Sequence, residues 1–178
     1  MSGGYLLDAN VLSYFLAFGH EELLLGDLAK VARIVIVEEV RDEVVRHPRY
    51  GAAFAERLPR SPLEVEGLAL GSSEAGLYAQ LHPDPSRSKD KGEHAAIAWA
   101  AHHADLVFVA NDKNAMWLAL AELHLPGGRL IGVRVFIRRM SELFGAFSRA
   151  AAVDIARASR GKEPTWWAAW LATLPPTH

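Results

Sequence analysis

The sequence predicts an α/β protein, a three-layer α/β/α sandwich around a central, mostly parallel sheet. Short apolar runs rich in β-branched residues alternate with longer stretches that have helical spacing. Such alternation is typical of parallel sheets, because each connection between parallel strands has to cross a face of the sheet. The chain of 178 residues is long enough for one such domain with its own hydrophobic core.

The first part of the chain is expected to supply three strands. The apolar residues 5–7 form a strand, and helices over 11–18 and 21–30 follow it. Residues 32–37 read ARIVIV, a short, continuous and β-branched run that is typical of a buried parallel strand. A helix follows at once and ends before Pro48. A helix over 50–58 then precedes an alternating edge strand at 63–68.

The second part continues the alternation. A helix over 72–81 begins with Ser72 or Ser73 as its cap. A polar loop with the sequence HPDPSRSKDKG separates it from an alanine-rich helix over 93–103. The run DLVFVA at 105–110 predicts another buried strand, followed by a helix over 113–123 and a last strand over 130–136.

We expect two parts, an α/β domain over residues 4–143 and a helical extension over residues 144–178. The extension ends in GKEPTWWAAWLATLPP, where Trp166 and Trp170 lie one helical turn apart and Trp167 stands beside them. The favoured interpretation is that these tryptophans anchor a terminal helix to the core or to a second subunit. The alternative is that they stack on nucleic-acid bases.

Composition narrows the classes of function. The chain has no cysteine, which excludes disulfides and thiolate metal sites. No apolar run approaches the length of a membrane span, and no basic, cleavable segment begins the chain, so a cytoplasmic protein without membrane contact is expected. The formal net charge of -2 argues against a protein that holds nucleic acid by bulk electrostatics. Any polyanionic partner therefore needs a local binding patch.

Four acidic residues occupy equivalent places relative to the predicted strands. Asp8 ends the first strand and Asp112 follows the strand at 105–110. Glu43 lies in the helix after ARIVIV, and Glu93 opens the helix after the polar loop. Ligands of open parallel sheets bind at the carboxyl ends of the strands, so these four side chains are expected to converge there.

Converging carboxylates repel one another unless they share protons or hold a cation. Oxygen ligands without cysteine suit a hard divalent ion, Mg²⁺ or Mn²⁺. A metal held in this way activates a water molecule and stabilises the leaving oxygen in phosphodiester hydrolysis. The acids therefore predict a metal-dependent phosphodiesterase site.

The motifs YLLDANVL, VEEVRDEVVRHP, KGEHAAIAWAAHHADLVFVANDKNA and LIGVRVF, in this order, resemble the PIN domain, the metal-dependent ribonuclease fold of VapC-type toxins of bacterial toxin–antitoxin pairs. The resemblance covers about residues 5–143. It implies that Asp8, Glu43, Glu93 and Asp112 are the catalytic, metal-binding acids, and that Asn10 accompanies the first of them. It also implies an endoribonuclease toxin with RNA as substrate, a cognate antitoxin as partner and a homodimer as assembly.

Two positions depart from the family pattern. Ala110 stands where the family often has Ser or Thr, and Asn114 replaces a further acid that is sometimes present. We expect such a site to hold one metal firmly and a second weakly.

Several basic and amide side chains flank the expected metal and are candidates for binding the phosphates of RNA, with an ordinary solvated loop as the alternative. The candidates are Asn10, Arg87, Lys89, Lys91, Asn111 and Lys113.

Each acid also has a purely structural interpretation. Asp8 and Asp112 are good caps for the helices that follow them, and Glu93 is favourable at a helix N-terminus. Glu39 is the alternative to Glu43 as the second acid. The histidines of the 93–103 helix lack the HExxH spacing of a zinc site and are expected to be packed or at the surface.

Two rival functions remain open. A catalytically silent PIN-like scaffold would bind RNA or a protein partner without cutting. A phosphohydrolase with Asp8 as nucleophile needs a second Asp two residues later, where the chain has Asn10.

Overall fold

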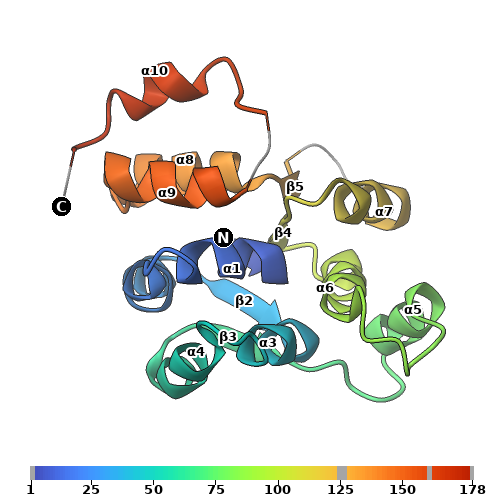
Figure 1. The fold of residues 1–178 in the computed structure, drawn as a ribbon. Helices are drawn as coiled ribbons and strands as arrows, with labels where there is room; N and C mark the ends of the chain where they lie inside the picture. The colour runs from blue at the N-terminus through green and yellow to red at the C-terminus, as the bar shows by residue number, and fades with distance from the viewer. Residues whose placement is uncertain (1–2, 124–127, 160–161, 177–178) are drawn as a thin grey trace.

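A computed structural model of the chain describes residues 3–123, 128–159 and 162–176 (Figure 1). Five strands form one sheet in the order β3-β2-β1-β4-β5, and every neighbouring pair is parallel. The strands are β1 (Gly4–Leu7), β2 (Ile34–Val37), β3 (Glu64–Glu66), β4 (Leu106–Val109) and β5 (Leu130–Ile131). The predicted α/β class with a helix-flanked parallel sheet is confirmed.

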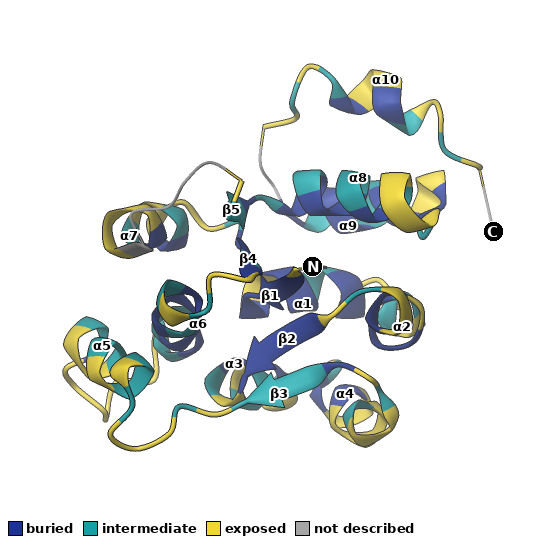
Figure 2. Cartoon of the chain, turned by 180° about the vertical axis from the view of Figure 1, so that it is seen from behind, coloured by how far each residue is buried: buried dark blue, intermediate teal, exposed yellow. Residues whose placement is uncertain are grey.

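The helices surround this sheet in a three-layer arrangement (Figures 1 and 2). They are α1 (Ala9–Leu16), the π-helix η1 (Leu23–Leu28), α2 (Ala29–Val31), α3 (Glu38–Val45), α4 (Gly51–Arg57), the 3-10 turn η2 (Leu58–Arg60), α5 (Ser73–Leu81), α6 (Lys91–His102), α7 (Lys113–Leu123), α8 (Val133–Phe144), α9 (Arg149–Ala158) and α10 (Trp167–Leu171). The predicted helix over 21–30 is therefore wound for most of its length as a π-helix.

The centre of the sheet is fully buried because its strands carry apolar residues on both faces. Every residue of β1 and β2 is buried, whereas the edge strand β3 is only half-buried. β1 pairs with β2 on one side and with β4 on the other, with Leu7 opposite Val109 at its carboxyl end. Since all strands point the same way, the segments that follow β1, β2 and β4 emerge at one edge of the sheet.

The prediction of a strand over 130–136 is wrong beyond Ile131. The chain turns at Gly132, and the segment from Val133 onward is the helix α8. The buried apolar residues of α8 are Val133, Phe136, Ile137 and Met140, which stand at positions i, i+3, i+4 and i+7, the pattern of one helix face. The LIGVRVF stretch is too short and too rich in β-branched residues to reveal that period, so it was assigned to a strand.

The tryptophans of the extension belong to the hydrophobic core. Trp167 is 1% exposed and Trp170 is buried beside it, with their ring centroids 5.0 Å apart. The guanidinium of Arg134 lies 5.7 Å from the ring centroid of Trp167, and that of Arg138 lies 5.0 Å from Trp166. These contacts anchor α10 over α8 and α9 (Figure 1) and leave the two buried indoles no face for a base. Across the described residues no helix combines the length and apolarity that crossing a bilayer requires.

Candidate functional site

The four predicted acids line two adjoining pockets at the carboxyl edge of the sheet. The first, of about 430 Å³, is lined by Asp8, Asn10, Glu43, Arg46, Ser88, Lys89, Asp90 and Glu93. The second, of about 380 Å³, is lined by Asn10, Lys89, Asp90, Glu93, His94, Asp112, Asn114 and Leu118. Glu93 lies on the boundary that both pockets share, with Asp8 and Glu43 on one side and Asp112 on the other.

Asp8 is both a helix cap and a member of the pocket. Asp8 is 1% exposed. Its Oδ1 accepts a hydrogen bond of 2.7 Å from the N–H of Ala9 at the start of α1. Its Oδ2 accepts a hydrogen bond of 3.4 Å from Nδ2 of Asn10. Burial raises the pKa of Asp8 to about 6, the Ala9 N–H opposes this, and the charge of Glu43 raises it further. The capping interpretation therefore does not exclude the ligand interpretation.

Glu93 couples the acids of both pockets. It stands in the first turn of α6, and burial raises its pKa to about 7. The charges of Asp8, Asp112, Asp90 and Glu43 all raise it further, in that order. Each of these four acids lines a pocket together with Glu93, which agrees with their effect on its pKa. Near neutral pH the group needs either a proton or a cation.

Glu43 reaches this group because α6 has a glycine where α3 approaches it. A Cβ built on Gly92 would lie 2.8 Å from Glu43 Oε2, a distance that real Cβ atoms do not tolerate. Glu43 is exposed as a residue, yet the contact with α6 partly covers its carboxylate, and desolvation followed by the charge of Asp90 raises its pKa. An alanine at position 92 would therefore displace the carboxylate of Glu43.

Glu39, the alternative second acid, faces a different part of the molecule. Its charge raises the pKa of Tyr78 on α5, after the larger effect of burial on that tyrosine. Glu39 Oε2 is buried and has no hydrogen-bond partner among the described residues. Of the two acids, Glu43 is the one that lines the first pocket.

Asp112 caps α7 in the way that its structural interpretation predicts. Its Oδ1 accepts the N–H groups of Asn114 at 2.7 Å and Ala115 at 3.3 Å. The residue is exposed, and its charge still raises the pKa of Glu93. Asp112 thus orients the start of α7 and contributes to the second pocket at the same time.

Several residues of the pockets have no role predicted from the sequence, and Asp90 and His94 are two of them. Asp90 lines both pockets and precedes α6 with a φ of 63°, a left-handed conformation that Asp adopts more readily than most residues. His94 lines the second pocket, and its Nδ1 lies 3.2 Å from His82 Nδ1. His82 Nε2 lies 2.8 Å from the carbonyl of Arg87, so its N–H donates there. The only available signal was their position beside Glu93.

The candidates for phosphate binding separate into two groups. Asn10 and Lys89 line both pockets. Arg87 is ion-paired with Asp90 at 3.2 Å and lines neither. Asn111 Nδ2 donates to the carbonyl of Ser159 at 2.9 Å, so it connects the end of β4 to the end of α9. The remaining candidates, Lys91 and Lys113, are not among the residues that line these pockets.

The donor set fits a hard divalent cation by its chemistry, because carboxylate and amide oxygens predominate. Within the described ranges, however, no three Asp, Glu or His side chains stand where they would hold one ion together. Binding would therefore require these carboxylates to move closer to one another.

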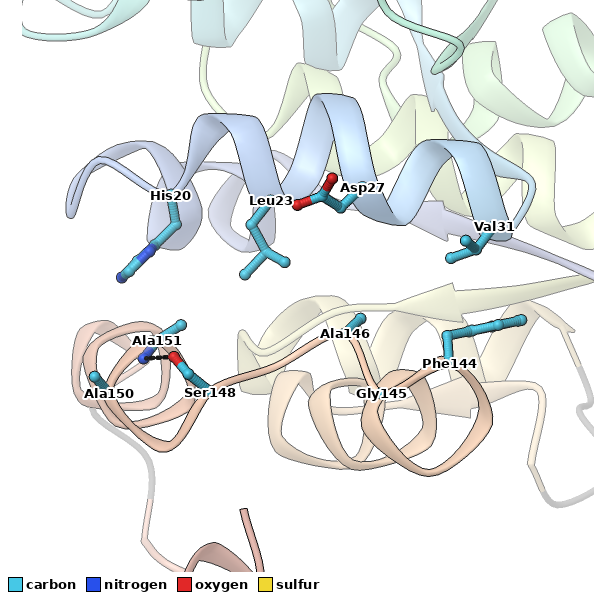
Figure 3. A pocket seen from close by; sticks show the side chains of 10 residues that line it. All are labelled: His20, Leu23, Asp27, Val31, Phe144, Gly145, Ala146, Ser148, Ala150 and Ala151. Carbon is cyan, nitrogen blue, oxygen red and sulfur yellow. Dashed lines mark hydrogen bonds between the residues drawn. The ribbon is translucent and has the colours of Figure 1, made fainter. Parts of the chain in front are cut away.

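A larger cavity of about 660 Å³ lies away from the acids (Figure 3). It opens between the η1–α2 segment and the connection from α8 to α9. Leu23 and Val31 line it on the first side, and Phe144, the last residue of α8, lines it on the other. His20 at its margin lies 3.3 Å from Asp154. This apolar cavity contains no group of carboxylates and no candidate for metal chemistry.

Comparisons with models of known protein families, with curated proteins and with solved structures find no match for this chain.

Proposed function

We propose that this protein is a divalent-metal-dependent endoribonuclease that hydrolyses RNA phosphodiester bonds. The observation that carries the proposal is that Asp8, Glu43 and Asp112 line two pockets that meet at Glu93. These acids come from four segments that are far apart in the chain. Burial, followed by neighbouring negative charges, raises the pKa values of Asp8, Glu43 and Glu93, and this costs stability. A bound cation is the simplest physical compensation for that cost.

In this proposal Asp8, Glu43, Glu93 and Asp112 hold Mg²⁺ or Mn²⁺. Such an ion supplies an activated water and offsets the charge that develops on the leaving oxygen. Glu93, whose pKa is about 7, is partly protonated near neutral pH in the metal-free protein, and metal binding would displace that proton. Asp8, whose pKa is about 6, is largely ionised at this pH. Lys89, which lines both pockets, holds the scissile phosphate.

The rival function is a silent PIN-like scaffold that binds RNA or a protein without cutting. One observation favours it: among the described residues no three potential ligands are placed to hold one ion. A scaffold, however, gives no reason for a carboxylate with a pKa near neutrality at the meeting point of two pockets.

The test is calorimetric titration with Mn²⁺, combined with cleavage of a labelled RNA. Asp8→Asn and Glu93→Gln are expected to weaken Mn²⁺ binding by about tenfold or more, since each removes a charged ligand, and to abolish cleavage. Gly92→Ala keeps every acid but displaces the Glu43 carboxylate, so it should weaken binding by a smaller factor.

Glu142→Gln is the matched control, because this exposed acid on α8 pairs with Arg138 at 2.6 Å and lines neither pocket. It should leave binding and cleavage unchanged. Absence of Mn²⁺ binding to the native protein, together with no effect of Asp8→Asn, would reject the nuclease and favour the scaffold.

We further propose that the enzyme is the cytoplasmic toxin of a toxin–antitoxin pair and acts as a homodimer, as the resemblance to the PIN domain implies. Induced expression in bacteria should then arrest growth, and Asp8→Asn should not. A short neighbouring gene for a DNA-binding antitoxin should relieve the arrest when it is expressed together with the chain. Arrest by the Asp8→Asn variant would contradict the toxin role.

A further inference from the structure

Trp117 is the most exposed aromatic side chain of the described residues. It is 72% exposed, whereas Trp167 and Trp170 are buried in the core. Figure 2 shows that much of the outer surface of α7 is exposed. An indole carries a large apolar surface, and leaving it in water forgoes the free energy that burial provides. Its position relative to the two pockets gives this exposure a function.

Trp117 lies beside the second pocket. Asn114 and Leu118, on the same helix, line that pocket together with Asp112 and Glu93. Trp117 immediately precedes Leu118 and follows Asn114 by three residues, so it occupies the strip of α7 next to the pocket lining. The indole is therefore at the rim of the acidic site.

A cation shares this strip. Lys113 lies four residues before Trp117, which places both side chains on the same face of α7 within one helical turn. Lys113 is exposed and directly follows Asp112. The rim thus presents an aromatic face and a positive charge side by side, next to a pocket lined with carboxylates.

We infer that Trp117 is a stacking platform for an unpaired base of the RNA, and that Lys113 contacts the adjoining phosphate. The inference rests on the proposed function, since it describes how that site holds its substrate. The chain has a net charge of -2 and the pocket is acidic, so bulk attraction cannot hold RNA there. Stacking on an indole provides affinity without net charge and accepts any base.

The platform selects a substrate class. In a duplex each base is stacked between its neighbours and paired, so it presents no open face to Trp117. A single strand, loop or bulge does. The substrate is therefore RNA that is unpaired next to the bond that is cut.

The experiment measures the fluorescence anisotropy of labelled RNA mixed with the full-length chain in EDTA, so that binding is read without cleavage. One probe is a single strand of mixed sequence, and the second is the same strand annealed to its complement. The variants are Trp117→Ala, Trp117→Phe and Lys113→Ala. Leu143→Ala is the control, because Leu143 is an exposed apolar residue of α8, at 64% exposure, that lines neither pocket.

Trp117→Ala is expected to weaken binding of the single strand by about tenfold, and Trp117→Phe should restore most of the loss. Lys113→Ala should weaken binding and make it less dependent on salt. Leu143→Ala should change affinity less than about twofold, and duplex binding should be weak for every variant. Circular dichroism melting checks that each exposed substitution leaves the fold intact.

Unchanged single-strand binding by Trp117→Ala would overturn the inference. Equal affinity of the native protein for the single strand and the duplex would also overturn it. A change in oligomeric state on Trp117→Ala without a change in RNA affinity would overturn it too, and would assign this face to contact between two copies. Failure of the proposed function is distinguishable, because it appears as absent Mn²⁺ binding and absent cleavage in the native protein, whatever the result with Trp117.

Discussion

Two regions of the molecule contribute to the stability of the protein with opposite signs. The acidic pockets bring carboxylates together. Burial, followed by the charges of neighbouring acids, raises the pKa values of Asp8, Glu43 and Glu93. We define the tryptophan layer as Trp166, Trp167 and Trp170 together with Arg134 and Arg138 of α8. The ring centroids of the tryptophans lie 5.0 to 6.2 Å apart, and the two guanidinium groups lie over Trp167 and Trp166. The first arrangement costs stability in the protein alone, and the second provides it.

The difference separates residues that maintain the fold from residues whose arrangement requires a ligand. Contacts in the tryptophan layer are favourable without any partner, because they bury apolar surface and place cations over aromatic rings. The pockets become favourable only when a proton or a cation enters. Substitutions in the two regions should therefore change different measured quantities.

The largest expected effect comes from truncation in the tryptophan layer. Trp167→Ala removes a buried indole that is 1% exposed and should lower the free energy of unfolding by about 3–5 kcal/mol. Urea unfolding followed by far-ultraviolet circular dichroism measures this loss. The half-buried Trp166 provides the control, and Trp166→Ala should cost clearly less. Equal costs for the two substitutions would show that burial in this layer does not determine its contribution.

The raised pKa values in the acidic pockets should make the free energy of unfolding of the metal-free protein depend on pH. Glu93 has an ordinary pKa of 4.5 and a folded pKa of about 7, so the folded state binds more protons between these values. Metal-free stability should therefore fall as the pH rises through this window, with Asp8 adding to the loss up to about pH 6. Allowing for partial exposure, Glu93 should account for about 1–2 kcal/mol between about pH 5 and about pH 8.

Unfolding in urea at the two pH values measures this loss, and Glu93→Gln should remove most of it. Trp166→Ala, which lies in the other region, should keep the native pH dependence. Stability that rises across the same window in the native protein would contradict the coupling of these carboxylates.

The smallest expected effect concerns the connection between the two regions. Asn111→Ala removes the hydrogen bond from Nδ2 to the Ser159 carbonyl, at a cost of about 0.5–1.5 kcal/mol in the free energy of unfolding. Because Asn111 is held by Ser159, the KM for RNA cleavage should not change. A raised KM with unchanged stability would instead support the sequence-based prediction that Asn111 binds substrate.

Much of the fold is predictable from local patterns. The β-branched run of β2 and the apolar run of β4 have no competing helical period, so both were placed correctly. α8 was missed because its first residues, Val133 and Val135, favour a strand by propensity, while the burial of Ile137 and Met140 that defines the helix lies beyond the motif.

The candidate site was partly accessible from the sequence. The grouping of Asp8 and Asp112 follows from their places after two adjacent parallel strands. The choice of Glu43 over Glu39 does not, since both stand in α3 and only the position of α6 separates them. The contact between Gly92 and the Glu43 carboxylate could not be predicted from the sequence either. A glycine in the first turn of a helix does not by itself indicate that a carboxylate from another helix lies beside it.

The sequence by itself determined the buried strands β1, β2 and β4 and the acidic residues that follow β1 and β4, because these depend on neighbours a few positions apart. Only the tertiary structure decided which carboxylates share a pocket, that Asn111 is held by Ser159 and that Trp167 is buried while Trp117 is not. Electrostatic coupling and burial depend on distances between segments that are remote in the chain. Those distances are set by packing, and local sequence patterns do not contain them.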